Sequence, residues 1–525
     1  MKSAFAVFDI GMTNKKVVIY DEALRQADAV YRVFPAIPAR GLTEKGELEA
    51  HDLAGIEDWF LDALASFASR YPIRAIAVTT HGATLVCVGE DGLPCAPCVF
   101  YTHEPGDDFH ERFYRLVGEP KKLQAVTGTP AFKAMINPSK GLMFVREQFP
   151  EEFARTRLVL NYPQYWGYRL TGKAGAEATY VGCHTYLWDF TAGRPSEVAR
   201  RLGVEKMLPA GLHESWDVLG AIKPEVASRT GLGKDVIVTM GIHDSNASLL
   251  PYLAKQGGRD FVLDSTGTWC VVMHPQEKYG FSADELGKVV FFNQSALRKP
   301  VKTAIFTGGL EFDDWTALID AASGAADDTG SVGAIGAVGA GRRIPPFDPA
   351  VYRDVIRDRE LFILPEIVQG SGQFPESKAR AIERGREFTY ESMKDGGPRP
   401  AFFADRARAY AALNLSLAIQ TDVALGRAGL APGADVFVEG GFRKNEDYVA
   451  LVQALVPRSR LALTNIAEAT SFGAAMTAKA AITGARLHEL AGDFEIERSD
   501  APRIGLPGLD EYRIAFLRLA ENDRR

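Results

Sequence analysis

Two apolar runs on either side of a polar turn stand near the beginning of the chain. Ala4 to Phe8 is apolar, Gly11 to Asn14 has turn residues, and Lys16 to Tyr20 runs back as a second mostly apolar stretch. This pattern predicts a β-hairpin whose turn presents polar side chains.

Helical and extended patterns then alternate. Apolar side chains recur at helical spacing from Asp52 to Arg70, and the apolar run Ile73 to Val78 ends in Thr79-Thr80-His81-Gly82. The same alternation returns later, with a helix pattern over Leu413 to Leu425 and a strand pattern over Asp435 to Val438. The alternation predicts an α/β protein.

A weak internal repeat divides the chain. The segment Phe5 to Thr13 resembles Phe261 to Thr268, because each is an apolar strand that ends in Asp and has Thr four residues later. The repeat predicts two related domains that face a shared cleft. A short apolar run that ends in glycine, Asp235 to Gly241, places the division at residues 1–238 and 239–525.

Two segments have little periodicity. Ala321 to Arg343 is rich in glycine and alanine, but no strand leads into it, so we expect a flexible surface loop and not a dinucleotide fingerprint. Gln373 to Pro400 is polar and is expected to be a second connecting region.

Composition narrows the class of protein. The 525 residues include 60 basic and 67 acidic side chains, a net charge of −7, and 46% are hydrophobic. These values are typical of a globular protein and exclude global disorder. Without basic tracts, we expect no binding to nucleic acid or to an anionic membrane surface.

Location is predicted from what the chain lacks. The first residues do not form a signal peptide, and no apolar run approaches the ~18 residues of a membrane span. Five cysteines are too few for a disulfide scaffold, which is typical of a reducing compartment. We therefore expect a cytoplasmic protein with small-molecule ligands, in which Cys95 and Cys98 are structural.

The first turn has the residues of a phosphate site. In the pattern Asp9-x-Gly11-x-Thr13-x-x-Lys16, glycine allows close approach of the backbone, and Thr13 and Lys16 offer a donor and a positive charge. Asp9 can hold a magnesium ion. The alternative is a tight turn in which Asp9 bonds local amides.

Three later segments extend this pattern. Asp264-Ser265-Thr266-Gly267-Thr268 is a second hydroxyl-rich turn, and two such turns can grip a polyphosphate from opposite sides. Gly440-Gly441 follows a strand and leaves bare backbone for a base or ribose, with Asn445 as an adenine contact or a helix N-cap. Glu468 to Ala475 is a run of small residues that opens a helix, where a ligand or another helix packs closely.

Taken in order, these segments and Gly241-Ile242-His243-Asp244-Ser245 resemble the FGGY carbohydrate kinase family of the actin-like ATPase superfamily. The resemblance implies two ribonuclease H-like domains with an interdomain cleft that closes on ATP, Mg²⁺ and a sugar or polyol. It implies that Asp244 is the general base and that Asp9 and Asp244 lie near the Mg²⁺ ion. A helix N-cap is the alternative for Asp244. The ATP contacts expected are Thr13, Asn14, Lys16, Thr266, Gly267, Thr268, Gly440, Gly441 and Asn445.

The sugar segments depart from the family's pattern. Phe100 to Pro105 replaces a Trp-x-Asp-x-Arg segment, and Met143 stands where tryptophan is common. A buried structural His81 and a salt-bridged Glu104 are the alternatives to sugar contacts. The substrate contacts expected are His81, Gly82, His103, Glu104, Gln164, His243 and Asp244.

The function expected is transfer of the γ-phosphate of ATP to a hydroxyl of a small sugar, with a ketose favoured. The alternatives are a kinase of a non-sugar polyol or hydroxylated metabolite, and a non-catalytic nucleotide-dependent sensor on the same fold. The sequence leaves open the sugar, the hydroxyl phosphorylated and whether the chain forms a homodimer.

Overall fold

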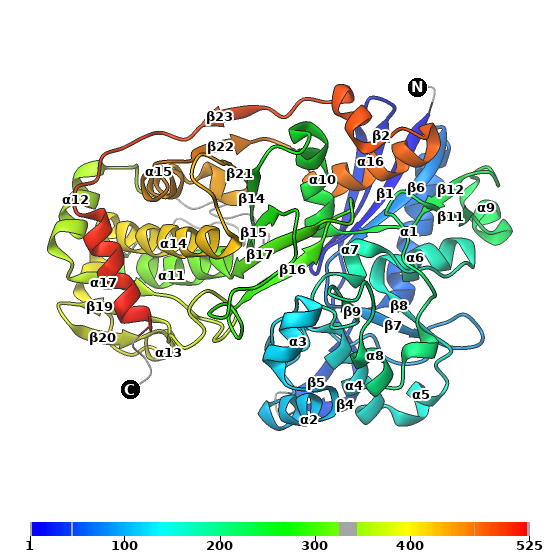
Figure 1. Ribbon diagram of the computed structural model, residues 1–525, viewed down its shortest axis with the longest axis horizontal. Helices are drawn as coiled ribbons and strands as arrows, with labels where there is room; N and C mark the ends of the chain where they lie inside the picture. Colours follow the sequence, from blue (N-terminus) through cyan, green and yellow to red (C-terminus); the bar gives the residue numbers. More distant parts are fainter. Residues whose placement is uncertain (1–2, 44–45, 325–343, 467, 522–525) are drawn as a thin grey trace.

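The computed structural model describes residues 3–43, 46–324, 344–466 and 468–521. It contains two large mixed sheets with helices packed around them. In Figure 1 the first half of the chain, in blue to cyan, lies on the right, and most of the second half lies on the left. The predicted α/β class is confirmed.

The first sheet has the strand order β11-β12-β6-β1-β2-β3, with β13 also paired to β6. The predicted hairpin is β1 and β2, and its antiparallel register sets Asp9 opposite Lys16. The strands of this sheet are β1 Ala4–Ile10, β2 Asn14–Asp21, β3 Gln26–Val33, β6 Ile73–Thr80, β11 Val218–Ala221, β12 Ile237–Thr239 and β13 Ile242–His243.

The second sheet has the order β16-β17-β15-β14-β21-β22-β23. Its hairpin β14–β15 is antiparallel and β21 runs parallel to β14, just as β6 runs parallel to β1. The internal repeat therefore corresponds to a repeated topology. The strands are β14 Phe261–Thr266, β15 Cys270–Pro275, β16 Val290–Gln294, β17 Pro300–Phe306, β21 Asp435–Gly440, β22 Arg460–Thr464 and β23 Arg498–Asp500.

Smaller sheets complete the strands of the described residues. They are formed by β4 Ile37–Thr43 with β5 Gly46–Ala50, β7 Leu85–Val88 with β8 Leu158–Asn161, β9 Trp188–Asp189 with β10 Arg194–Pro195, and β18 Leu361–Leu364 with β19 Arg380–Glu383 and β20 Arg386–Thr389.

The helix predicted over 52–70 is α1, Leu53–Ala68. Asp52 caps this helix by accepting a hydrogen bond from the Gly55 amide. The apolar face of α1 packs on the first sheet, where the Phe60 and Phe8 rings stack with their centroids 4.1 Å apart. The other helices are α2 Asp107–Val117, α3 Pro120–Thr127, α4 Pro138–Gln148, α5 Pro150–Ala154, α6 Tyr162–Thr171, α7 Ala178–Val181, α8 Glu197–Arg201, α9 Pro224–Thr230, α10 Asp244–Gln256, α11 Gly308–Ser323, α12 Pro349–Asp358, α13 Tyr390–Lys394, α14 Arg406–Ala428, α15 Glu446–Leu455, α16 Ala469–Thr483 and α17 Leu509–Glu521.

Helices α10 and α16 join the two halves. Although α16 is late in the chain, it packs on α10 and against the first sheet, as Figure 1 shows. A Cβ atom on Gly473 would stand 1.8 Å from the Ala247 carbonyl oxygen, so this close approach requires glycine. The helix-packing interpretation of the small-residue run is confirmed, and the packing brings the start of α16 to the first hairpin.

Two expectations about the chain's organisation need correction. Gln373–Pro400 is not merely a connection, because it contains β19, β20 and α13, elements of only four or five residues whose periodicity is too brief to detect. The predicted loop over Ala321–Arg343 begins inside α11, which continues to Ser323, and residues 325–343 lie outside the described residues. The division at residue 238 stays a prediction. It falls inside β12, and both β12 and the following β13 pair with β6.

Across the described ranges, no helix has both the length and the apolar character needed to cross a membrane.

Candidate active site

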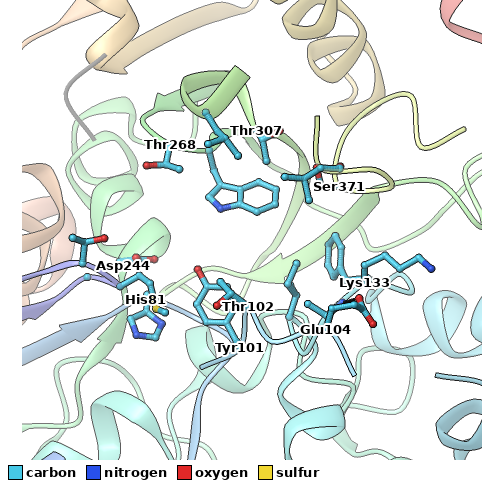
Figure 2. Close-up of a pocket in the computed structure, with 18 of the residues that line it drawn as sticks. His81, Tyr101, Thr102, Glu104, Lys133, Asp244, Thr268, Thr307 and Ser371 are labelled. Carbon is cyan, nitrogen blue, oxygen red and sulfur yellow. Dashed lines mark hydrogen bonds between the residues drawn. The ribbon is translucent and has the colours of Figure 1, made fainter. Parts of the chain in front are cut away.

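A cavity of about 1000 Å³ opens where the two halves meet (Figure 2). Both predicted turns contribute to its lining, through Thr13 and Lys16 from the first and Thr268 from the second. Asp244 at the start of α10 and Thr470 at the start of α16 also line it. Its volume lies at the upper end of the range for small-molecule sites, about 300–1,000 Å³.

Asp9 is held from three directions. Its Oδ2 atom accepts hydrogen bonds from the hydroxyls of Thr470 and Ser471, both at 2.5 Å, and lies 3.3 Å from Lys16 Nζ. The side chain is almost fully buried. Its partners include the N-terminus of a helix from the other half of the chain, so they differ from the local amides of the tight-turn alternative.

Lys16 lies between two carboxylates. Its Nζ atom pairs with Glu468 as well as with Asp9. Burial alone would lower the pKa of Lys16, but the Asp9 and Glu468 carboxylates raise it above its usual value. Lys16 is therefore a cation over the physiological pH range, and Thr13 and Asn14 line the cavity beside it.

Asp244 is the first residue of α10, and its carboxylate faces the cavity with 30% of the side chain exposed. Oδ1 accepts a hydrogen bond from the Ser245 amide at 2.6 Å, so the carboxylate does not cap an amide one turn into the helix. Burial raises the pKa of Asp244 to about 7, with hydrogen bonds from Ser245 acting in the opposite direction. Near neutral pH this carboxylate can both accept and release a proton.

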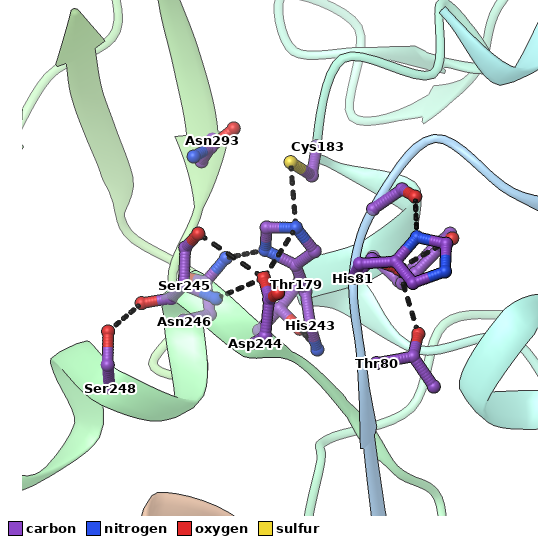
Figure 3. A network of polar contacts seen from close by, with 12 residues as sticks. Thr80, His81, Thr179, Cys183, His243, Asp244, Ser245, Asn246, Ser248 and Asn293 are labelled. Atoms are coloured by element: carbon purple, nitrogen blue, oxygen red, sulfur yellow. Dashed lines mark hydrogen bonds and ion pairs between the residues drawn. The ribbon is translucent and has the colours of Figure 1, made fainter. Parts of the chain in front are cut away.

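A smaller cavity of about 190 Å³ adjoins the larger one and shares His81, Tyr101, Trp269 and Asp244 with it. Its other polar lining residues include Cys183, His184, His243, Ser245 and Asn293. Figure 3 shows Asp244 and His243 between α10 and the segment that carries Cys183.

The histidines of this cavity are neutral. Burial lowers the pKa of His81, His184 and His243 to about 3 in each case. His81 Nδ1 is 2.8 Å from the Gly82 carbonyl oxygen, which assigns the proton to Nδ1 and leaves Nε2 as an acceptor. Within the described chain, His81 Nε2 and Asn293 Oδ1 are buried without a hydrogen-bond partner. Both atoms belong to residues that line the smaller cavity, where a ligand hydroxyl would satisfy them.

Several predicted sugar residues lie elsewhere. Gln164 is fully buried and donates to the Met240 carbonyl oxygen, away from both cavities. His103 packs against Phe144, with ring centroids 5.0 Å apart, and lines neither cavity. Glu104 lines the larger cavity, but its carboxylate accepts hydrogen bonds from the Gly106 and Ala134 amides and pairs with His110 at 2.8 Å. These contacts fix the position of Glu104 at the edge of the cavity, and its contact with a sugar stays a prediction.

Several residues predicted to contact the nucleotide lie outside both cavities and hydrogen-bond to other parts of the protein. The Thr266 hydroxyl donates a hydrogen bond to the Glu439 carbonyl oxygen and accepts one from the Phe442 amide. Its proton is therefore not available to a phosphate. Asn445 caps α15 and donates to Asn414, as the N-cap alternative predicts. Gly267, Gly440 and Gly441 do not line either cavity, and their nucleotide contacts, like that of Asn445, stay predictions.

Sequence reasoning missed several residues of the site. Trp269 and Asn293 line the smaller cavity from the second sheet, and Cys183 and His184 line it from the segment after α7. None belongs to a motif. The Asp9 contacts of Thr470 and Ser471 had a partial signal, because both belong to the small-residue run.

Comparison with known families agrees with this geometry. The N-terminal domain model of the FGGY family of carbohydrate kinases matches residues 4–251, and the FGGY C-terminal domain model matches residues 258–486. The chain therefore belongs to the FGGY family of carbohydrate kinases.

Individual relatives match in part. A xylulose kinase from Bacillus subtilis is 28% identical over 152 residues, or 29% of this chain and 30% of the relative. A rhamnulokinase from Enterococcus faecalis is 30% identical over 131 residues, or 25% of this chain and 26% of the relative. These matches span less than a third of either relative.

Solved structures match over the whole fold. A carbohydrate kinase from Novosphingobium aromaticivorans superposes with a TM-score of 0.73 and 26% identity, covering 98% of this chain and 97% of that one. A xylulose kinase from Lactobacillus acidophilus has a TM-score of 0.75 at 15% identity, with the same coverage. The two-domain actin-like ATPase fold implied by the resemblance is confirmed.

Proposed function

We propose that this protein transfers the γ-phosphate of ATP to a hydroxyl of a small neutral sugar. The larger cavity would take the phosphates and the smaller cavity the sugar. The observation that carries the proposal is the position of Asp244, which lines both cavities where they join. A base there reaches the sugar hydroxyl on one side and faces the phosphate turns on the other.

Asp244 acts as the general base. Its carboxylate accepts the proton of the sugar hydroxyl as the hydroxyl oxygen forms a bond to the γ-phosphorus, and the bond from phosphorus to the ADP oxygen breaks. Thr13, Asn14 and Thr268 offer donors to the phosphates, and Lys16 adds a fixed positive charge. Transfer depends mainly on this positioning and charge stabilisation.

The residues also fit a magnesium ion. Asp9 and Asp244 both offer carboxylate oxygens to the larger cavity, and oxygen atoms are the ligands that magnesium prefers. With Asp9 Oδ2 held by Thr470 and Ser471, its Oδ1 is the oxygen available to a metal. When bound, the ion would screen the negative charge of the phosphates.

The lining of the smaller cavity supports a neutral substrate. Its described residues include no lysine or arginine, and its histidines are uncharged. A sugar acid or phosphorylated sugar would leave its charge unpaired there, which is costly in a buried site. Unpaired acceptors such as His81 Nε2 favour a ligand with several hydroxyls, and a ketose or its reduced polyol is our expectation.

The rate should depend on pH through Asp244. As a base it works only when deprotonated, so kcat/KM for the sugar should fall about tenfold per pH unit below about pH 7 and level off above it. The measurement is a pH profile of kcat/KM at saturating ATP. A profile that stayed flat down to about pH 5 would contradict this assignment.

A substrate panel tests the proposal. The purified protein is given ATP and Mg²⁺ with neutral ketoses, aldoses, polyols, sugar acids and nucleosides, and phosphorylated products are identified by mass spectrometry. Turnover with a neutral ketose or polyol is expected. Turnover with sugar acids or nucleosides alone would overturn the substrate class, and ATP binding without any turnover would favour the sensor alternative.

A further inference from the structure

Three side chains with soft or borderline metal-binding atoms converge beside Asp244. Cys183 and His184 follow the short helix α7, and His243 ends β13. One ligand atom from each lies within 4.8 Å of the other two. Figure 3 shows the Cys183 sulfur directed at the His243 ring, with Sγ and Nε2 3.6 Å apart.

Two of the separations fit a tetrahedral zinc centre, those from His243 Nε2 to Cys183 Sγ and to Asp244 Oδ1. Zinc bonds of about 2.3 Å to sulfur and 2.0 Å to nitrogen place those two atoms about 3.5 Å apart in a tetrahedron. The Asp244 Oδ1 atom lies 3.3 Å from the same His243 nitrogen, which is about the spacing of nitrogen and oxygen ligands on one ion. Asp244 therefore offers a carboxylate oxygen beside His243 as a fourth ligand.

Gly82 leaves the required space open. A Cβ atom at this position would stand 2.9 Å from His243 Nε2 and 3.0 Å from His184 Nε2. Both nitrogens therefore lie about 3 Å from one point, which the side chain of any larger residue at position 82 would occupy. An ion can reach this point through the smaller cavity, which Gly82, Cys183, His184 and His243 all line.

His243 also has a neighbour that can orient its ring. Asn246 Nδ2 lies 3.4 Å from His243 Nδ1, and Asn246 Oδ1 is buried without a partner among the described residues. Rotating the amide by half a turn would let Oδ1 accept the Nδ1 proton and leave Nε2 free for a metal. Metal-binding histidines commonly donate their second ring nitrogen in this way.

We propose that Cys183, His184 and His243 bind a zinc ion, with Asp244 as the fourth ligand, and that the bound ion inhibits the kinase. Binding releases the thiol proton to solvent, because the thiolate is the ligand. The site is distinct in chemistry from a magnesium site, since magnesium prefers oxygen ligands. Inhibition rests on the proposed function: zinc on Cys183, His184 and His243 would occupy the cavity proposed for the sugar and bond the Asp244 oxygen that faces it.

The test begins with metal binding alone. The full-length protein is dialysed against buffered zinc without nucleotide or sugar, and one zinc ion per chain is expected. Cobalt in place of zinc should give a thiolate-to-cobalt charge-transfer band. Cys183→Ser should lower zinc affinity at least about 100-fold and remove that band, since loss of even an orienting partner typically costs 10–100-fold.

Two further variants keep the test decisive. His184→Asn should also weaken zinc binding at least about tenfold, and it serves if Cys183→Ser does not fold. Cys95→Ser, which changes a half-buried cysteine that lies near Thr156 and lines neither cavity, should keep both the affinity and the cobalt band. In kinase assays, zinc should inhibit Cys95→Ser as it does the unmodified protein.

The possible results separate the two proposals. Absence of zinc binding, or zinc affinity unchanged in both Cys183→Ser and His184→Asn, overturns the metal site even if the protein phosphorylates a sugar. Zinc binding with the cobalt band in a protein that phosphorylates no substrate supports the site and counts against the proposed kinase reaction. Bound zinc that leaves the rate unchanged overturns the inhibitory role.

Discussion

Replacing Asp244 with asparagine is expected to slow phosphoryl transfer at least about 100-fold, while ATP and sugar bind with near-normal affinity. Asparagine keeps the size of the side chain, but its amide does not accept a proton near neutral pH. Removal of a general base typically costs about 10²–10⁴ in rate. The measurement is single-turnover transfer from labelled ATP, with binding of each ligand measured separately.

Asp58→Asn is the matched control. This carboxylate is 68% exposed on α1, where it pairs with Arg229, and its replacement should leave turnover unchanged. Near wild-type turnover in Asp244→Asn would refute the role of base. A loss of folded protein large enough to account for the loss of rate would instead assign Asp244 a structural role.

Replacing Lys16 with methionine should lower turnover about 100-fold or more and change the sugar's KM by only a few-fold. The substitution removes the fixed positive charge that stabilises charge developing on the phosphates, and losing one such group typically costs 10²–10³ in rate. It also leaves the Asp9 and Glu468 carboxylates without the cation between them. Steady-state kinetics in ATP and in sugar separate the two effects.

Lys255→Met provides a comparison at equal burial. Lys255 is 19% exposed, as is Lys16, and pairs with Glu495 at 3.4 Å outside the cavities. It should keep normal turnover. A Lys16→Met protein with normal turnover and a lost sugar affinity would place Lys16 at the sugar and not at the phosphates.

The parts of the site that local sequence determines were predictable. Asp9 and Lys16 face each other because a hairpin with a short turn fixes its own register, and the repeat of that hairpin located Thr268. The family's ordered motifs pointed to Asp244. Each of these motifs is made of residues that are close together in the chain.

The contacts between distant segments were not predictable in this way. Thr470 and Ser471 reach Asp9 across more than 450 residues because Gly473 lets α16 pack on α10. Asn445 has the same local pattern whether or not it contacts adenine, and its bonds to Tyr448 and Asn414 show the helix cap while the adenine contact stays a prediction. The hydrogen bonds of Gln164 and Thr266 were not predictable either, because their partners are backbone groups of distant segments.

The sugar is proposed to occupy the smaller cavity against Asp244, and a Gly82→Ala variant probes this position. The added methyl group would stand 2.9 Å from His243 Nε2 inside that cavity, whereas Gly426→Ala, on an exposed part of α14 with open space around it, is the matched control. We expect Gly82→Ala to raise the sugar's KM about tenfold or more and to leave ATP affinity unchanged, since overpacking typically costs about 1–3 kcal/mol. An unchanged sugar KM in Gly82→Ala would contradict it.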